Sequence, residues 1–332
     1  MIKFFSIIAL FICSGVNVFA TETTGVISTI QPINSLVSAI IGNTGKSITI
    51  IPSEQSPHDF KLKPSDVKVL QNGNIIFYVS NHLESSITKV LKNLPKNIKL
   101  INLMEDAGVN HLAIRDNDAW ERHDHHGHDD HDVHDKHGKK HDDHDDHDKH
   151  EKKHDDHDDH EKEDDVHVWL SPDNAIKIVQ KVNKVLSLYF PENSKIYNDN
   201  TTKFIDKIRN LKMELVKELS PIKNKPFIVF HDAYQYFEKT FELNAVGSVA
   251  LEGDIASSPK QISLIKDKIV KSKALCVFQE PQFDSKLVKI VVEGTDAKIG
   301  TLDPLGVNIS ENKDFYLQLI TNMAKSLKEC LG

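Results

Sequence analysis

The 332-residue sequence is poor in cysteine and lacks the spacing of a zinc knuckle. It has three cysteines, Cys13, Cys276 and Cys330, and no two of them form a Cys-x-x-Cys pair. A metal–thiolate site of that type is therefore not expected. There is also no H-E-x-x-H helix of the kind that a zinc-protease site requires, because the one such spacing, HEKKH at residues 150–154, falls in a charged run without the apolar residues of a packed helix.

The sequence has no basic excess outside a single acidic tract. Its formal net charge is −8. Residues 123–160 contain fifteen Asp or Glu and six Lys, a local balance of −9, so the rest of the chain sums to +1. No basic patch marks a nucleic-acid interface, and we expect no nucleic-acid partner.

The apolar stretch at the amino terminus, FFSIIALFICSGV, is too short to span a membrane comfortably. It follows Lys3, and small or tolerated residues stand at Val18 and Ala20. This pattern predicts a secretory signal at residues 1–20, cleaved after Ala20, and hence an exported protein. A retained membrane anchor is the alternative. Cleavage would remove Cys13.

The mature chain would then keep Cys276 and Cys330. An even pair in an exported protein favours a disulfide, here between the strand-like ALCVF segment and the last helix. A metal–thiolate site is the alternative, disfavoured by the spacing and by oxidation outside the cytoplasm.

A histidine–aspartate tract runs from His123 to His160 and holds fourteen of the nineteen histidines. Imidazole and carboxylate are ligands that divalent cations such as zinc accept. Val133 is its one apolar residue, so the tract cannot bury enough surface to offset its ordering entropy. We expect a disordered loop that collects metal weakly, with a solvated charged linker as the alternative. Its candidate ligands are His123, His125, His126, His128, His131, His134, His137, His141, His144, His147, His150, His154, His157 and His160.

Strand-like and helix-like stretches alternate on both sides of this tract, which predicts α/β units on mostly parallel sheets. About 310 mature residues suggest two domains. A long charged helix of roughly 40 Å between them is typical of a rigid connector. We expect a signal peptide at 1–20, a first lobe at 21–191 with the His/Asp-rich loop at about 116–165, a connecting helix at 192–219 and a second lobe at 220–332.

Local signals place some helix ends. The helix at 64–73 is expected to use Ser65 as its N-cap and Gly73 as its stop. Pro172 falls inside the start of the next strong amphipathic helix, where proline is tolerated.

Five histidines lie outside the tract, and three of them occupy similar loop positions. His58 follows a strand and a proline, His167 precedes a helix, and His231 ends a strand. Sites in open α/β sheets form beyond the carboxyl ends of strands, so these three could converge on one ion. His82 could line the same cleft, and His111 is expected at the entry to the loop.

Carboxylates beside these histidines are candidates for the rest of the site. Asp303, at a strand end, is a possible fourth ligand, and Glu280 is expected to be structural. Asp59, Asp165 and Asp232 stand next to the histidines and could orient their rings as hydrogen-bond acceptors.

Several motifs resemble, in the same order, those of the zinc-specific substrate-binding proteins of bacterial ABC transporters. They are SPHDFKLKPSDVKVLQN, the His–Asp tract, HVWLSPDNA, FIVFHDAYQYFEK, CVFQEPQF and GTLDPLGVNI, and they cover nearly the whole mature chain. The resemblance implies two (β/α)4 lobes joined by a long rigid helix, with the metal in the cleft between them.

The same resemblance implies His58 and His167 from the first lobe and His231 from the second as zinc ligands. Manganese-type relatives tend to carry a glutamate where His231 stands. Some zinc-type members have a glutamate directly before the first histidine, but Pro57 occupies that position here, which leaves water or Asp303 as the fourth ligand. Family members also join the cysteines that match Cys276 and Cys330.

The resemblance therefore predicts a monomeric periplasmic protein, not an enzyme, that captures Zn²⁺ and delivers it to a membrane permease. The His-rich loop would collect zinc, hand it on or sense its excess. A zinc hydrolase is one alternative, because three histidines and an open position also describe catalytic zinc. A zinc buffer or adhesin without a permease is the other.

Overall fold

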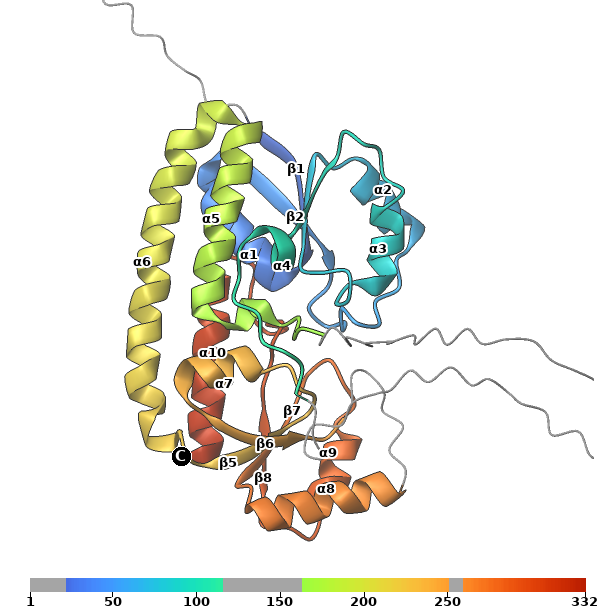
Figure 1. The fold of residues 1–332 in the computed structure, drawn as a ribbon, viewed down its shortest axis with the longest axis vertical. Helices are drawn as coiled ribbons and strands as arrows, with labels where there is room; N and C mark the ends of the chain where they lie inside the picture. Colours follow the sequence, from blue (N-terminus) through green and yellow to red (C-terminus); the bar gives the residue numbers. More distant parts are fainter. Residues whose placement is uncertain (1–21, 116–162, 251–258) are drawn as a thin grey trace, which may run out of the picture.

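A computed structural model describes residues 22–115, 163–250 and 259–332. Within these ranges the chain forms two α/β lobes that lie end to end, each with one four-stranded parallel sheet (Figure 1). The predicted fold class is confirmed. The expected signal peptide and nearly all of the His/Asp-rich loop lie outside the described residues. Among the described helices, none combines the length and apolar character needed to cross a membrane.

The first sheet has the strand order β2-β1-β3-β4. Helix α1 lies on one of its faces, and α2 and α3 lie on the other (Figure 1). The inner strand β3, with sequence IIFY, is buried at every residue, as expected for a parallel strand covered on both faces. The elements are β1 (Thr23–Ile30), α1 (Gln31–Ile41), β2 (Gly45–Ile51), α2 (Pro64–Gln71), β3 (Ile75–Tyr78), α3 (Ser85–Leu91), β4 (Lys99–Asn102) and α4 (Leu103–Asp106).

The predicted cap of α2 is wrong. The helix begins at Pro64, one residue before Ser65, with Lys63 as the N-cap. The carboxylate of Asp66, at the third helical position, accepts the backbone N–H of Lys63 at 2.8 Å, so this side chain and not Ser65 supplies a capping hydrogen bond. The helix ends at Gln71, ahead of Gly73.

The second sheet repeats the topology of the first, with the order β6-β5-β7-β8. Helix α7, which follows the FIVFHD segment, was not expected from the sequence. The elements are β5 (Pro226–Val229), α7 (Gln235–Phe241), β6 (Asn244–Ser248), α8 (Pro259–Ser272), β7 (Cys276–Gln279), α9 (Lys286–Val292), β8 (Lys298–Thr301) and α10 (Phe315–Leu331).

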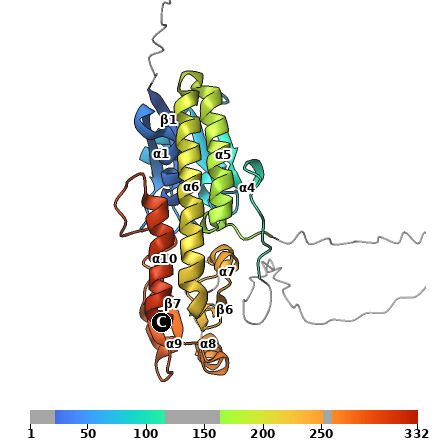
Figure 2. The ribbon, with the colours of Figure 1, turned by 90° about the vertical axis from the view of Figure 1, so that its left-hand side faces the viewer.

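Two long helices, α5 (Pro172–Tyr189) and α6 (Ser194–Leu219), line one side of the molecule. Pro172 occupies the first turn of α5, as predicted, and the Ser171 hydroxyl accepts the backbone N–H of Asn174. The 26 residues of α6 span about 39 Å. Helix α6 packs against α1, α5 and α10 and runs alongside both lobes (Figures 1 and 2).

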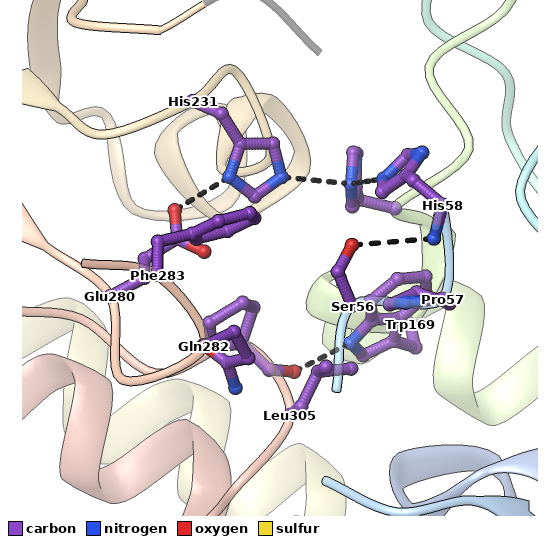
Figure 3. Close-up of a pocket in the computed structure, with 11 residues that line it drawn as sticks. Ser56, Pro57, His58, Trp169, His231, Glu280, Gln282, Phe283 and Leu305 are labelled. Atoms are coloured by element: carbon purple, nitrogen blue, oxygen red, sulfur yellow. Dashed lines mark hydrogen bonds and ion pairs between the residues drawn. The ribbon is translucent and has the colours of Figure 1, made fainter. Parts of the chain in front are cut away.

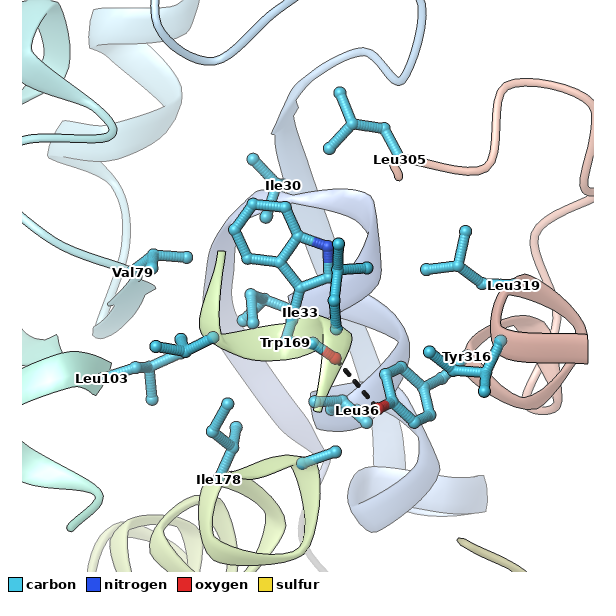
Figure 4. Packing of buried hydrophobic residues seen from close by; sticks show 14 of the residues in the cluster. Ile30, Ile33, Leu36, Val79, Leu103, Trp169, Ile178, Leu305, Tyr316 and Leu319 are labelled. Carbon is cyan, nitrogen blue, oxygen red and sulfur yellow. Dashed lines mark hydrogen bonds between the residues drawn. The ribbon is translucent and has the colours of Figure 1, made fainter. Parts of the chain in front are cut away.

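The main hydrophobic core continues from one lobe to the other through Trp169. This side chain is 1% exposed and lies among Ile30 and Ile33 of the first lobe and Leu305 of the second (Figure 4). Its Nε1 donates to the carbonyl oxygen of Pro304 at 2.9 Å. Its own carbonyl oxygen accepts the Tyr316 hydroxyl at 2.9 Å. A buried core of this kind favours small lobe movements, because close-packed interiors do not deform continuously.

Cys276 of β7 is bonded to Cys330 of α10, with their Cα atoms 6.2 Å apart. The predicted disulfide is confirmed. It joins the second sheet to the last helix across 54 positions of sequence.

Replacing both cysteines with alanine should lower the free energy of unfolding. A loop of this length corresponds to about 4 kcal/mol in the chain-entropy model, and about 2–4 kcal/mol is the usual range. Urea unfolding with and without reductant measures it, since reductant should destabilise the wild-type protein and leave the double variant unchanged. Equal midpoints for the two proteins under oxidising conditions would contradict the prediction.

Candidate metal centre

Three histidines converge in the region between the lobes. His58 comes from the loop after β2, His167 precedes a short turn of 3-10 helix (Val168–Leu170), and His231 lies two residues beyond β5. Their ligand nitrogens all lie within 4.8 Å of one another, and they form a group of possible metal ligands among the described residues (Figure 3). The structure thus brings together the three histidines singled out in the sequence.

The spacing of the nitrogens fits one small tetrahedral ion. His167 Nε2 lies 3.3 Å from His58 Nε2 and 3.4 Å from His231 Nε2. Two nitrogens bound tetrahedrally to one zinc ion at about 2.05 Å are roughly 3.3 Å apart. His167 therefore lies from each of the other two histidines at the separation that a shared zinc ion requires.

Two buried carboxylates orient these rings from behind. Asp165 Oδ1 lies 2.7 Å from His167 Nδ1 and also accepts the backbone N–H of His167 at 2.9 Å. Glu280 Oε1 lies 2.6 Å from His231 Nδ1. When the carboxyl group is ionised, its oxygen accepts a hydrogen bond from Nδ1–H, and Nε2 of the same ring then presents a lone pair to the shared point. Lone pairs from separate rings facing one another repel until a cation lies between them.

Burial keeps the imidazoles of His58 and His167 neutral. Burial, together with the neighbouring His167 and His231, holds the pKa of His58 well below its ordinary value. Burial and His231 likewise lower the pKa of His167 well below that value. Burial raises the pKa of the Asp165 carboxyl to about 7, against the opposing effect of the His167 backbone hydrogen bond. Because their pKa values are lowered, these nitrogens stay unprotonated, and so can bind a metal, at a pH where exposed histidines are already protonated.

The histidines line a small cavity with largely apolar walls. Its volume of about 10 Å³ matches the space that one water molecule needs. Trp169 lies against His167, with ring centroids 5.3 Å apart, and Phe283 lies against His231 at 5.8 Å. The walls restrict water and suit a single ion. The lining residues are Ser56, Pro57, His58, His167, Trp169, His231, Glu280, Gln282, Phe283, Pro304 and Leu305.

Asp303 does not join the three histidines. Its carboxylate accepts the backbone N–H groups of Leu305, Gly306 and Val307 at 3.1, 2.8 and 2.6 Å, and the side-chain amide of Gln282 at 3.0 Å. Gly306 has a φ of +78°, which this turn needs and which glycine adopts without strain. The side chain shapes the turn after β8.

The remaining candidates divide between support and surface. Asp165 orients a ring as expected, but Asp232 pairs with Arg115 instead of a histidine. Asp59 and His82 are exposed. His111 is exposed too, and its Nδ1 lies 2.7 Å from Asp164 Oδ2 beside the His/Asp-rich loop. The fourteen histidines of the tract lie outside the described residues.

Sequence reasoning missed the part played by Glu280. Its position directly after β7, at the same edge of the sheet as His231, was the available signal. What it could not reveal is that β5 and β7 are neighbours in the sheet. That adjacency brings the two side chains into contact.

The fold and the site together define a two-lobed metal-binding protein with its site between the lobes. Residues 26–330 match the family model described as "ZnuA: Zinc-uptake complex component A periplasmic". The chain belongs to this family.

Several relatives support the assignment. The chain is 43% identical over 313 residues to the high-affinity zinc uptake system protein ZnuA of Brucella suis, covering 94% of this chain and 93% of that protein. The protein of the same name from Haemophilus ducreyi is 34% identical over 306 residues, with 92% and 93% covered.

Solved structures share the fold at lower identity. A zinc-bound deletion mutant of ZnuA has a TM-score of 0.69 at 21% identity, with 94% of this chain and 98% of that chain covered. The laminin-binding protein Lmb of Streptococcus agalactiae, described as having adhesin and metal-transporting activity, has a TM-score of 0.70 at 19% identity, with 93% and 100% covered.

The lowered imidazole pKa values predict an unusual pH profile for metal binding. Three independent imidazoles with an ordinary pKa of about 6.5 would weaken zinc binding roughly 50-fold between pH 7.5 and 6.0. Here His58 and His167 stay unprotonated through that window, since protons compete only below their lowered pKa values. We expect a loss of less than about tenfold.

Competition with a chelator, in a variant lacking residues 123–160, measures this profile without interference from the tract. The chelator's own protonation is corrected for at each pH. A loss of 50-fold or more would show that the imidazoles titrate as exposed groups.

Proposed function

We propose that this protein captures Zn²⁺ in the periplasm and delivers it to the membrane permease of an ABC transporter. His58 and His167 of the first lobe and His231 of the second hold the ion. Water takes the fourth position, because the Asp303 carboxylate is engaged in its own turn. No bond of a substrate is made or broken.

The observation that carries this proposal is the spacing of the three Nε2 atoms. Separations of 3.3 and 3.4 Å match a tetrahedral zinc shell. Neutral imidazoles suit zinc better than the harder manganese ion, which favours carboxylates. The relatives named for zinc uptake, to which the chain is 34–43% identical over more than nine-tenths of its length, support transport as the purpose.

A zinc hydrolase is less well supported. Such an enzyme needs a base that can take a proton from zinc-bound water. Glu280 is the one carboxylate among the described residues that line the cavity, and its Oε1 lies behind the His231 ring, 2.6 Å from Nδ1. In that position it orients the ligand and does not face the ion.

The flanking segments take supporting roles in this proposal. Residues 1–20 direct export and are removed, and the segment at about 116–165 gathers zinc at many weak His and Asp sites and passes it to the cleft. The body of the protein divides into a lobe at 21–191, a connecting helix at 192–219 and a lobe at 220–332, and it acts as a monomer.

Replacing any one of the three histidines with alanine should abolish the tight zinc site. The loss should exceed the roughly 10–100-fold that removal of a supporting hydrogen bond costs. Calorimetric titration of zinc and manganese into the protein lacking residues 123–160 measures it. The matched control is His82→Ala, which removes an exposed histidine outside the group. A tight site that survives all three substitutions, or that disappears when the tract is deleted, would refute the assignment.

Growth under zinc limitation tests delivery separately from binding. A strain deleted for the gene should grow poorly in chelated medium, and the wild-type protein should restore growth while His231→Ala should not. Deleting residues 123–160 should slow zinc uptake while leaving the affinity of the cleft unchanged. Full growth of the deleted strain without the protein would favour a buffer or adhesin.

A further inference from the structure

The three proposed ligands belong to two lobes, so their spacing depends on how the lobes are held. His58 and His167 are carried by the first lobe, and His231 by the second. On the side of α10, the core around Trp169 joins the lobes. A second junction lies where the segment that follows α4, residues 107–115, runs down to α7 of the other lobe (Figure 1).

Arg115 forms the polar centre of this second junction. Its Nε donates to Asp232 Oδ2 at 2.9 Å, and its Nη2 contacts the other oxygen of the same carboxylate. Its Nη1 and Nη2 donate to the two oxygens of Glu238 at 2.7 and 3.1 Å. One guanidinium of the first lobe therefore grips two carboxylates of the second, a geometry that lysine cannot reproduce.

The junction is largely shielded from solvent. The side chains of Arg115, Asp232 and Glu238 are 19%, 22% and 8% exposed. Ion pairs at this depth are screened less by salt than surface pairs are. Removing one partner is also costly, because it leaves the charge of the other buried without its counter-charge.

Hydrogen bonds from α7 extend the junction to the base of the insertion, that is, to the two chain segments at which the His/Asp-rich loop begins and ends. The Tyr236 hydroxyl donates to the carbonyl oxygen of Asp165 at 2.9 Å and accepts the backbone N–H of Leu112 at 3.1 Å. The Gln235 side chain donates to the carbonyl oxygen of Ala113 at 3.1 Å. Both chain segments at the base are thus tied to one helix of the other lobe.

In each lobe, these contacts involve a residue that adjoins a proposed ligand. Asp232 directly follows His231 in the chain, and Asp165 holds the ring of His167. Arg115 and Tyr236 therefore act on the neighbours of a ligand from each lobe.

We propose that Arg115, Asp232, Tyr236 and Glu238 form an interlobe clamp that sets the separation of His167 and His231 and so limits the rate at which zinc leaves. Arg115 is a positioning residue, because it acts through the carboxylates of Asp232 and Glu238, to which it donates. This inference rests on the proposed zinc-capture function. Release at the permease would require the clamp to open.

The test is the zinc dissociation rate, followed by stopped flow into excess chelator, in the protein lacking residues 123–160. Arg115→Leu should raise this rate roughly 10–100-fold, the usual effect of losing a supporting contact at a metal site. Arg115→Lys, which keeps the charge and loses the paired geometry, should give an intermediate increase.

Two further proteins separate positioning from folding. The triple variant Arg115→Leu, Asp232→Asn, Glu238→Gln also neutralises the two carboxylates that Arg115 binds, so it should regain thermal stability while zinc still dissociates fast. Tyr197→Phe breaks a buried hydrogen bond to Thr23 in the first lobe. It should lower stability and leave the dissociation rate unchanged.

The outcomes distinguish the two proposals. If the wild-type protein binds zinc tightly but Arg115→Leu releases it within about twofold of the wild-type rate, the clamp is refuted and zinc capture stands. If the dissociation rate follows thermal stability across all variants, Arg115 has only a structural role. If the wild-type protein has no tight site, the proposed function itself fails.

Discussion

The site depends on three imidazoles whose nitrogens converge on one point between the lobes. Asp165 and Glu280 orient two of the rings, because each carboxylate accepts a hydrogen bond from Nδ1 of His167 or His231. Lone pairs of these rings then face the same point, and a cation bound there relieves their repulsion. Apolar walls from Trp169 and Phe283 strengthen the effect, since charge interactions grow as water is excluded.

Holding such a site open demands a scaffold that resists collapse. The two sheets share one topology, and their strand ends face the same region, so the ligands come from short loops on rigid strands. Helix α6 and the core around Trp169 connect the lobes on one side, and the contacts of Arg115 connect them on the other. The contacts that stabilise the fold therefore also hold the ligands of the two lobes close together.

Much of this could be predicted from the sequence, because periodicity and strand-end position are local properties. They indicated the alternating strands and helices, Pro172 at the start of α5 and the shared setting of His58, His167 and His231. What failed depends on strand neighbours and side-chain reach. Glu280 meets His231 only because β5 pairs with β7, and Asp303 turns to its own loop. Asp232 lies beside a ligand in the chain, yet its partner is Arg115, which lies 117 positions away.

The base of the insertion has a consequence for variation among such proteins. Ala113 and Asp164 form an antiparallel bridge, flanked by hydrogen bonds from Ile114 to Glu163 and from Asp165 to Leu112. The chain thus leaves the lobe and returns at adjacent points, and whatever connects them closes a loop between fixed ends. Each doubling of such a loop costs only about 0.6 kcal/mol. Evolution can therefore lengthen, shorten or replace the intervening sequence, and an engineer can graft a reporter there, with little penalty to the fold that carries the metal.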